Sequence, residues 1–243
     1  MKHQKFAAEF LGTGILVALI CGAIVIPDYG SSQGIATLTI ASASGFAVAA
    51  LAYAIGPISG CHINPAITVC LWTAGRFPAR EVPYYVVAQF LGGLAGAALV
   101  SGLLSGRAGG ADLAPPLLLA QTGWGASYSM TSAFIAETFA TFVLSLVVLA
   151  VTAERTGTPL GGVAVGLAVT VLLITFMRVS GASLNPARSF GPALLGGGEP
   201  LAQFWLYCVA PVLGGVLAAL ADKILHSPVE AANNARRAER STV

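Results

Sequence analysis

Charge is what this sequence has least of. Only 9% of its 243 residues are charged, whereas 56% are hydrophobic and the mean hydropathy is +0.82. Because a soluble domain carries roughly 25% charged residues, this composition excludes one and indicates an integral membrane protein. A helix needs about 20 residues to cross the ~30 Å hydrocarbon layer, so the chain has room for about six spans and no separate soluble domain.

Other absences narrow the chemistry. The four cysteines and His62 show no metal-ligand or redox spacing, so we expect neither a metal site nor a cofactor. The net charge of +2 gives no reason to expect a nucleic-acid partner. No A-x-A cleavage site follows the first apolar run, which is also too long for a signal peptide, so we interpret it as a retained span.

Six apolar runs are long enough to cross a membrane: residues 5–26, 34–55, 82–104, 131–152, 160–179 and 202–225. Two further helical segments, 65–74 and 186–195, would each cover only about 15 Å and are predicted to be re-entrant half-helices. The sequence thus predicts an all-α membrane protein with six transmembrane helices and two half-helices, in one domain over residues 1–226. We expect the polar tail 227–243 to be mobile.

One eight-residue phrase occurs twice. Residues 59–66 and 180–187 both read Ser-Gly-x-x-x-Asn-Pro-Ala, and their asparagines, Asn64 and Asn185, are 121 residues apart. Together with an Ala-Glu pair near the start of each half, this indicates a duplication over about residues 5–104 and 131–225. Each repeat has three spans, an odd number, so the second is inverted relative to the first. The half-helices then enter from opposite faces and their N-termini meet near the midplane.

Basic residues are divided unevenly between the two sides of this topology. One side holds Lys2, Lys5, Arg76, Arg80, Arg155, Lys223, Arg236, Arg237 and Arg240, and the other holds Arg107, Arg178 and Arg188. By the positive-inside rule, we expect a multi-pass protein of the plasma or inner membrane with both termini and the tail in the cytoplasm. The connection 105–129 then lies outside, and we expect it to be an ordered surface loop.

The repeated phrase also predicts chemistry. Asparagine is a favoured N-cap and proline suits the first helical position, so each triplet predicts a helix start. The triplets are Asn64, Pro65, Ala66 and Asn185, Pro186, Ala187. Non-helical backbone just before them, at membrane depth, implies a water-filled path. Facing helix N-termini would repel cations there, while the asparagine amides could donate hydrogen bonds to a neutral solute.

Three charged residues lie well inside the apolar segments, away from the basic and acidic residues at the segment ends. Arg188 follows the second triplet where Ile67 follows the first, and we expect it to line the path rather than pair with a buried carboxylate such as Glu137. Glu9 and Glu137 could form an ion or proton relay. Their equivalent positions in the two repeats favour a structural role instead, in which each carboxylate binds the backbone N–H groups of a re-entrant loop.

Both phrases, the extension Arg188-Ser189 and the two glutamates resemble the aquaporin, or major intrinsic protein, family over residues 5–225. The resemblance implies a right-handed bundle of six tilted helices with two half-helices, one pore per subunit and commonly a homotetramer in membrane lipid. The family's four filter positions fall here on Ser44, Leu173, Ala182 and Arg188. Strict water channels usually carry an aromatic residue and a histidine at the first two of these positions, and this chain has neither.

The filter therefore implies a wider pore that passes water and small neutral solutes such as glycerol, urea or uncharged metalloid hydroxides. Arg76-Phe77-Pro78, Tyr207 and the small filter residues are most similar to the nodulin-like branch and its bacterial relatives, although Ser189 follows the water-channel pattern. A strictly water-selective channel and an inverted-repeat secondary transporter are the alternatives. An intramembrane protease lacks support, because no Ser, His and Asp set recurs in the spans.

Overall fold

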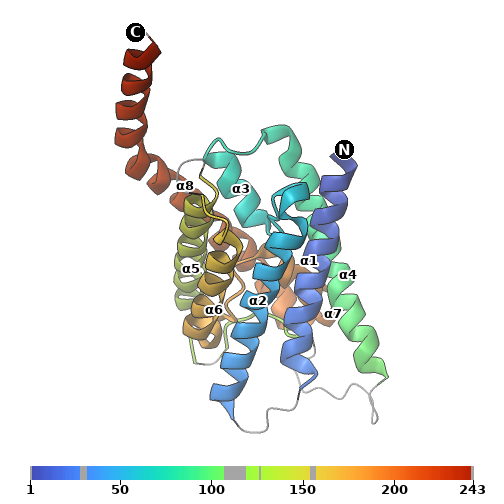
Figure 1. Cartoon of the computed structure of the whole chain (residues 1–243). Coiled ribbons are helices and arrows are strands. Elements are labelled where there is room, and N and C mark those ends of the chain that lie inside the picture. The colour runs from blue at the N-terminus through green and yellow to red at the C-terminus, as the bar shows by residue number, and fades with distance from the viewer. Residues whose placement is uncertain (1, 28–31, 107–118, 126, 154–156, 242–243) are drawn as a thin grey trace.

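The computed structural model describes the backbone of residues 2–27, 32–106, 119–125, 127–153 and 157–241, and side chains within these ranges from His3 to Leu225. Eight α-helices and one short 3₁₀-helix make up its described regular structure (Figure 1). The first repeat holds α1 Lys2–Val25, α2 Gln33–Ser59, α3 Pro65–Thr73, η1 Ala79–Glu81 and α4 Val82–Ser105. The second holds α5 Met130–Val151, α6 Gly161–Ser180, α7 Pro186–Gly196 and α8 Gly198–Ser241.

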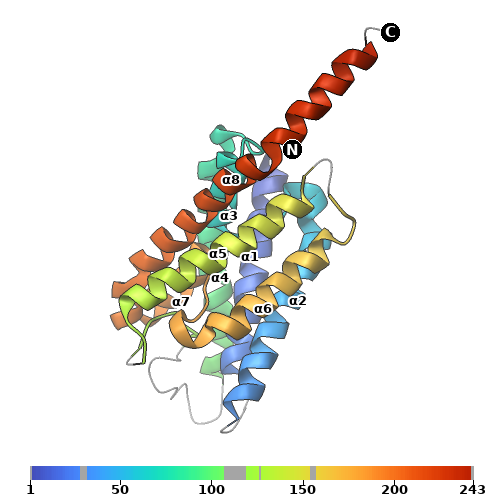
Figure 2. The same ribbon diagram turned by 90° about the vertical axis from the view of Figure 1, so that its left-hand side faces the viewer.

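Six of these helices are long and apolar enough to cross a membrane, and α3 and α7 are not, which confirms the predicted fold class. Two ends differ from the prediction. Helix α2 continues to Ser59 with Pro57 inside it, and ends where Gly60 takes a left-handed φ of 89°. Helix α8 runs on as one helix to Ser241 and projects beyond the bundle (Figure 2). The predicted mobility of this tail stays a prediction.

The helix contacts follow an approximate twofold symmetry. Helix α1 packs on α4 as α5 packs on α8, and α2 packs on α6 across the boundary between the repeats. Each half-helix packs mainly on the last helix of the other repeat, α3 on α8 and α7 on α4. The two repeats therefore interlock, and both helix ends of the chain lie on the same side of the bundle (Figure 1).

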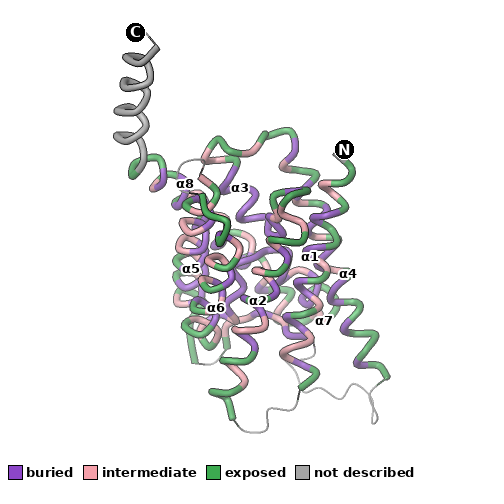
Figure 3. Tube along the Cα trace, in the orientation of Figure 1, coloured by how far each residue is buried: buried purple, intermediate pink, exposed green. Residues whose placement is uncertain are grey.

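Small residues make these crossings close. A side-chain carbon added at Gly92, Gly96 or Gly166 would meet a backbone carbonyl of the neighbouring helix. Such contacts allow membrane helices to pack tightly without any hydrophobic drive between them. Buried residues accordingly gather between the helices and exposed ones on the outside of the bundle (Figure 3). The exposed residues include large apolar side chains such as Leu11, Phe46 and Ile135.

The charges that fixed the predicted topology are only partly described. Arg107 and Arg155 lie outside the described residues, as do residues 107–118 and 126 of the predicted connection 105–129, and nothing beyond Leu225 has described side chains. On the side of the termini, Arg76 donates to Asp222 at 2.5 Å and to the carbonyl of Leu149 at 2.6 Å, which joins the end of α3 to α8 and α5.

Candidate functional site

Both repeated triplets begin a half-helix, as the sequence predicts. Asn64 caps α3, its Oδ1 accepting from the N–H of Ala66 at 2.9 Å. Asn185 caps α7, its Oδ1 accepting from the N–H groups of Ala187 at 3.0 Å and Arg188 at 3.3 Å. The positive ends of both helix dipoles therefore point toward the region where the two asparagines lie next to each other.

The two asparagines are also joined to each other's loops. The Nδ2 of Asn64 donates to the carbonyl of Leu184 at 2.8 Å, and the Nδ2 of Asn185 donates to the carbonyl of Ile63 at 2.8 Å. Each of these hydrogen bonds joins one repeat to the other, so the N-termini of the two half-helices are held facing each other. An Asn amide has two N–H donors, which leaves one on each side chain for a passing molecule.

The loops that lead into the triplets share an unusual backbone. Glycines 60 and 181 have φ of 89° and 81°, and four non-glycine residues also have positive φ. These are Cys61 at 51°, Ile63 at 42°, Ala182 at 45° and Leu184 at 56°, which occupy the same places in both phrases. Such conformations cost of order 1–3 kcal/mol each and persist only where surrounding contacts fix them.

The two buried glutamates make those contacts. Glu9 accepts from the Ser59 hydroxyl at 2.7 Å and from the N–H groups of His62 and Ile63 at 2.9 and 2.6 Å. Glu137 accepts from the Ser180 hydroxyl at 2.7 Å and from the N–H groups of Ser183 and Leu184, both at 2.8 Å. Both glutamates are completely buried, and each uses both carboxylate oxygens to hold a loop.

A second pair of supports was not recognised in the sequence. The hydroxyl of Tyr85 donates to the carbonyl of Ser59 at 2.8 Å, and that of Tyr207 donates to the carbonyl of Ser180 at 2.7 Å. Both tyrosines are completely buried. Their separation of 122 residues nearly equals that of the two asparagines, and this shared offset is the signal that could have identified them.

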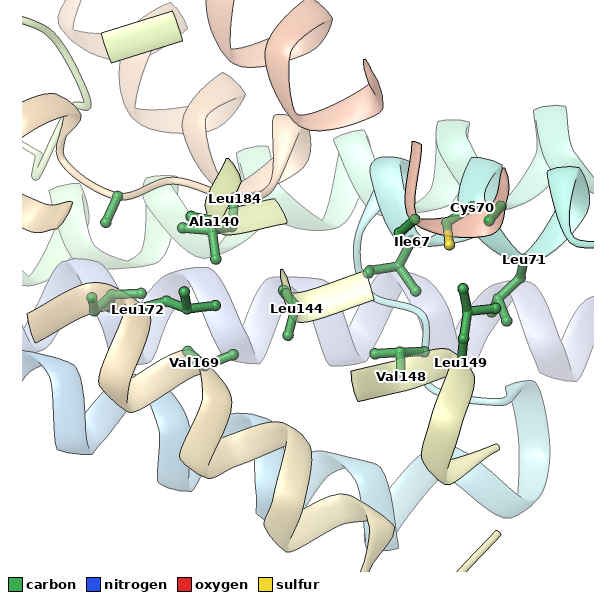
Figure 4. Close-up of a cluster of buried hydrophobic side chains, with 14 of the residues drawn as sticks. Ile67, Cys70, Leu71, Ala140, Leu144, Val148, Leu149, Val169, Leu172 and Leu184 are labelled. Carbon is green, nitrogen blue, oxygen red and sulfur yellow. The ribbon is translucent and has the colours of Figure 1, made fainter. Parts of the chain in front are cut away.

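A cavity of about 320 Å³ runs past both loops. Its polar lining includes the side chains of His62, Asn64, Ser183, Asn185 and Arg188, and apolar side chains line the rest of its middle. Figure 4 shows several of these apolar side chains: Ile67, Leu71, Leu144, Val148 and Val169. A lining that combines hydrogen-bonding groups with apolar side chains suits small molecules that carry both hydroxyl and hydrocarbon surface.

Three of the four predicted filter residues line this cavity: Leu173, Ala182 and Arg188. Ser44 does not line it. Its side chain is completely buried, and its hydroxyl donates to the carbonyl of Ile40 at 2.7 Å, so it offers no donor to a solute.

Arg188 is 4% exposed and borders the cavity. Its Nη1 donates to the carbonyl of Ala120 at 2.8 Å. Neither of the two ion pairs found among described side chains includes Arg188, so the alternative pairing with Glu137 has no support there. Because Arg has five N–H donors, several are left to face the lumen.

Comparison with known proteins agrees with this geometry. The model of the family "Major intrinsic protein" matches residues 1–222. Aquaporin Z of Rhodopseudomonas palustris is 39% identical over 229 residues, covering 93% of this chain and 94% of the relative. Aquaporin Z of Bradyrhizobium diazoefficiens is 40% identical over 221 residues, covering 89% and 91%.

A solved structure is also similar. The X-ray structure of the aquaglyceroporin from Plasmodium falciparum superposes with a TM-score of 0.84 at 28% identity, covering 95% of this chain and 99% of that one. These matches extend over nearly the whole chain and include its half-helices and both repeats. The protein described here belongs to the major intrinsic protein family, and is a multi-pass membrane channel of the aquaporin and aquaglyceroporin type rather than an enzyme.

Proposed function

We propose that this channel conducts water together with small neutral solutes, such as glycerol, urea or uncharged metalloid hydroxides, and excludes ions and protons. The observation that carries the proposal is the lining of the cavity beside Arg188. Leu173 and Ala182 present hydrocarbon there, and Ser44 lies behind the lining. At the two filter positions where strict water channels usually carry an aromatic residue and a histidine, this chain has Ser44 and Leu173. His62 and Tyr53 are the described residues that bring an imidazole and an aromatic ring to the cavity lining, and neither is at a filter position.

Exclusion of cations follows from the asparagine pair. Two helix N-termini place positive partial charge on either side of the midplane, which raises the energy of a cation or hydronium there. The two asparagines each have one free N–H, and together these groups donate to both lone pairs of one solute oxygen. That oxygen then has no lone pair left to accept a proton from a neighbouring water. A neutral molecule therefore crosses while a proton does not follow it.

Selection by size and polarity is proposed for Leu173, Ala182 and Arg188. The guanidinium donates to a hydroxyl or carbonyl oxygen, and Leu173 and Ala182 contact the hydrocarbon side of a polyol or the face of urea. Ser44 acts through its small volume: a larger residue at this fully buried position would displace its neighbours toward the lumen.

Orientation and assembly complete the proposal. The start of α1, which holds Lys5, and the connection from α3 to α4, which holds Arg76 and Arg80, lie on the side of the bundle from which α8 projects (Figure 1), so we place both termini in the cytoplasm of a cell membrane. The apolar outer faces of the helices contact lipid and, in part, other copies of the chain in a homotetramer.

Stopped-flow light scattering of proteoliposomes that contain the full chain tests this function. We expect osmotic swelling in glycerol, urea and boric acid as well as rapid water flow, with rates linear in solute concentration and no need for an ion gradient. Swelling that saturates or requires a proton or sodium gradient would support the transporter alternative. Water flow without solute flow would instead support the strictly water-selective channel.

A further inference from the structure

The described part of the connection between the repeats, residues 119–125, is fastened to the second repeat at alternate positions. We call this segment the strap. The carbonyl of Ala120 accepts from Arg188 at 2.8 Å, and the hydroxyl of Thr122 lies 2.6 Å from that of Ser189. Trp124 binds Gln203 of α8 through both its N–H and its carbonyl, at 2.9 and 3.3 Å.

Gln203 holds the strap through a pair of opposed hydrogen bonds. Its Oε1 accepts from the N–H of Trp124, and its Nε2 donates to the Trp124 carbonyl and, at 2.8 Å, to Oε1 of Glu199. Gln203 is 6% exposed, so water does not readily replace these partners. The amide thus fixes both the position and the direction of the strap at its end.

The strap in turn determines where the Arg188 guanidinium lies. Ala120 has a φ of 59°, a strained value for a residue with a side chain, so its carbonyl faces Arg188 only while both flanks of the strap are held. On one flank, Leu119 and Ala120 belong to a buried hydrophobic cluster with residues of α1 and α4, among them Val17 and Ala97. Trp124 packs against Leu206 and Tyr207 on the other.

We propose that Gln203 is a positioning residue for selectivity: it sets the place of Arg188 in the lumen through the strap, without contacting the solute itself. This inference rests on the proposed role of Arg188 in the filter. If the Gln203 bonds are lost, Ala120 no longer stays opposite Arg188, and the released guanidinium N–H turns to acceptors in the lumen. The passage then narrows, which hinders a large solute more than water.

The test compares Gln203→Leu with the full-length wild type in proteoliposomes. We expect the ratio of glycerol to water permeability to fall about five-fold, the effect of one lost hydrogen bond of ordinary strength on a barrier. A role in folding alone would reduce the number of working channels and lower both permeabilities equally. An unchanged ratio in Gln203→Leu therefore overturns the proposal.

A paired variant provides rescue. Gln203→Glu keeps the acceptor for the N–H of Trp124 but sets two carboxylates against each other at Glu199, so the ratio should fall. Adding Glu199→Gln exchanges the two groups and restores the hydrogen bond between them, while the Trp124 carbonyl stays without its donor, so the ratio should recover to a value between those of Gln203→Glu and wild type. A double variant no better than Gln203→Glu contradicts the proposal.

Failure of the proposed function is distinguishable from failure of this inference. If the wild type passes no glycerol, the broad filter is wrong, and the inference is then tested on the activation energy of water permeation. The activation energy should rise in Gln203→Leu and return part of the way in the double variant, whereas equal activation energies in the wild type and both variants contradict the role of Gln203.

Discussion

The two repeats hold their re-entrant loops by matching hydrogen bonds to a glutamate and a tyrosine, but they differ in the hydrogen bonds that join each loop to its half-helix. In the first, His62 Nδ1 lies 3.1 Å from the Thr68 hydroxyl, and Gln89 Nε2 of α4 donates to Thr68 at 3.0 Å and to Glu9 at 2.7 Å. The inner contact, between His62 and Thr68, joins the fourth residue of the phrase to the half-helix α3. The outer contact, from Gln89 to Thr68, joins this pair to the membrane-spanning helix α4.

In the second repeat, the hydroxyls of Ser183 and Ser189 lie 2.6 Å apart at the places of His62 and Thr68. The residue 122 positions after Gln89 is Pro211, which has no amide to offer. Thr122 of the strap provides the outer contact instead. The first loop is therefore held by a helix and the second by a connecting segment, and the segment is the part that also reaches Arg188.

The largest effect is expected where the repeats are alike. Glu9→Gln and Glu137→Gln each replace one accepting carboxylate oxygen by an NH₂ group. That NH₂ group then faces N–H or hydroxyl donors and cannot accept from them. Each substitution should lower the free energy of unfolding by about 3–5 kcal/mol, the cost of breaking a buried charged network. Thermal unfolding of the purified protein in detergent measures this. A variant of either repeat with wild-type stability would show that its loop does not depend on the carboxylate.

Next come the contacts between each half-helix and the opposite repeat. A side-chain carbon at Gly93 would meet the carbonyl of Ala187, and one at Gly215 would meet the carbonyl of Ala66 at 2.8 Å. Gly93→Ala and Gly215→Ala should each destabilise the protein by about 1–3 kcal/mol through overpacking.

Gly102→Ala is the matched control, because the added carbon has nothing within 4 Å. It should leave stability unchanged or raise it by up to about 1 kcal/mol, since alanine is the better helix former. Equal melting temperatures for all three variants would mean that the half-helices are not closely packed.

A smaller effect separates the repeats. Gln89→Leu removes one bond to Glu9 and one to Thr68, and should cost about 1–2 kcal/mol of stability with the glycerol-to-water permeability ratio unchanged. Thr122→Val removes the hydroxyl that contacts both Ser189 and Tyr207, and should cost about 1 kcal/mol while changing that ratio. Melting curves and light scattering on the same preparations check both. The reverse pattern would place selectivity in the first repeat.

Much of this arrangement is predictable from the sequence because it depends on strong local signals. Hydropathy and length predict the six spans, and Asn-Pro identifies both half-helix starts, since few residue pairs suit an N-cap and the first helical position so well. The odd number of spans per repeat requires inversion. The role of Glu9 and Glu137 as loop supports also follows from their equivalent positions.

The strap and the burial of Ser44 were not predictable in the same way. Ala120 acts through its backbone carbonyl, which no side chain reveals, and Gln203 binds backbone atoms of Trp124 rather than a recognisable partner. The position of Ser44 in the family pattern suggests a lumen residue, but its hydroxyl satisfies a carbonyl of its own helix, a common local alternative for serine.

The central claim is that the residues around Arg188 make this a channel for solutes larger than water, and the double variant Leu173→His with Ser44→Phe tests it most directly. The imidazole and the ring should narrow the cavity beside Arg188, so that glycerol permeability in proteoliposomes falls about ten-fold, equivalent to about 1.4 kcal/mol. Water permeability, measured on the same vesicles, should change by less than about two-fold and shows that the variant is folded. Glycerol permeability equal to that of the wild type would contradict the account.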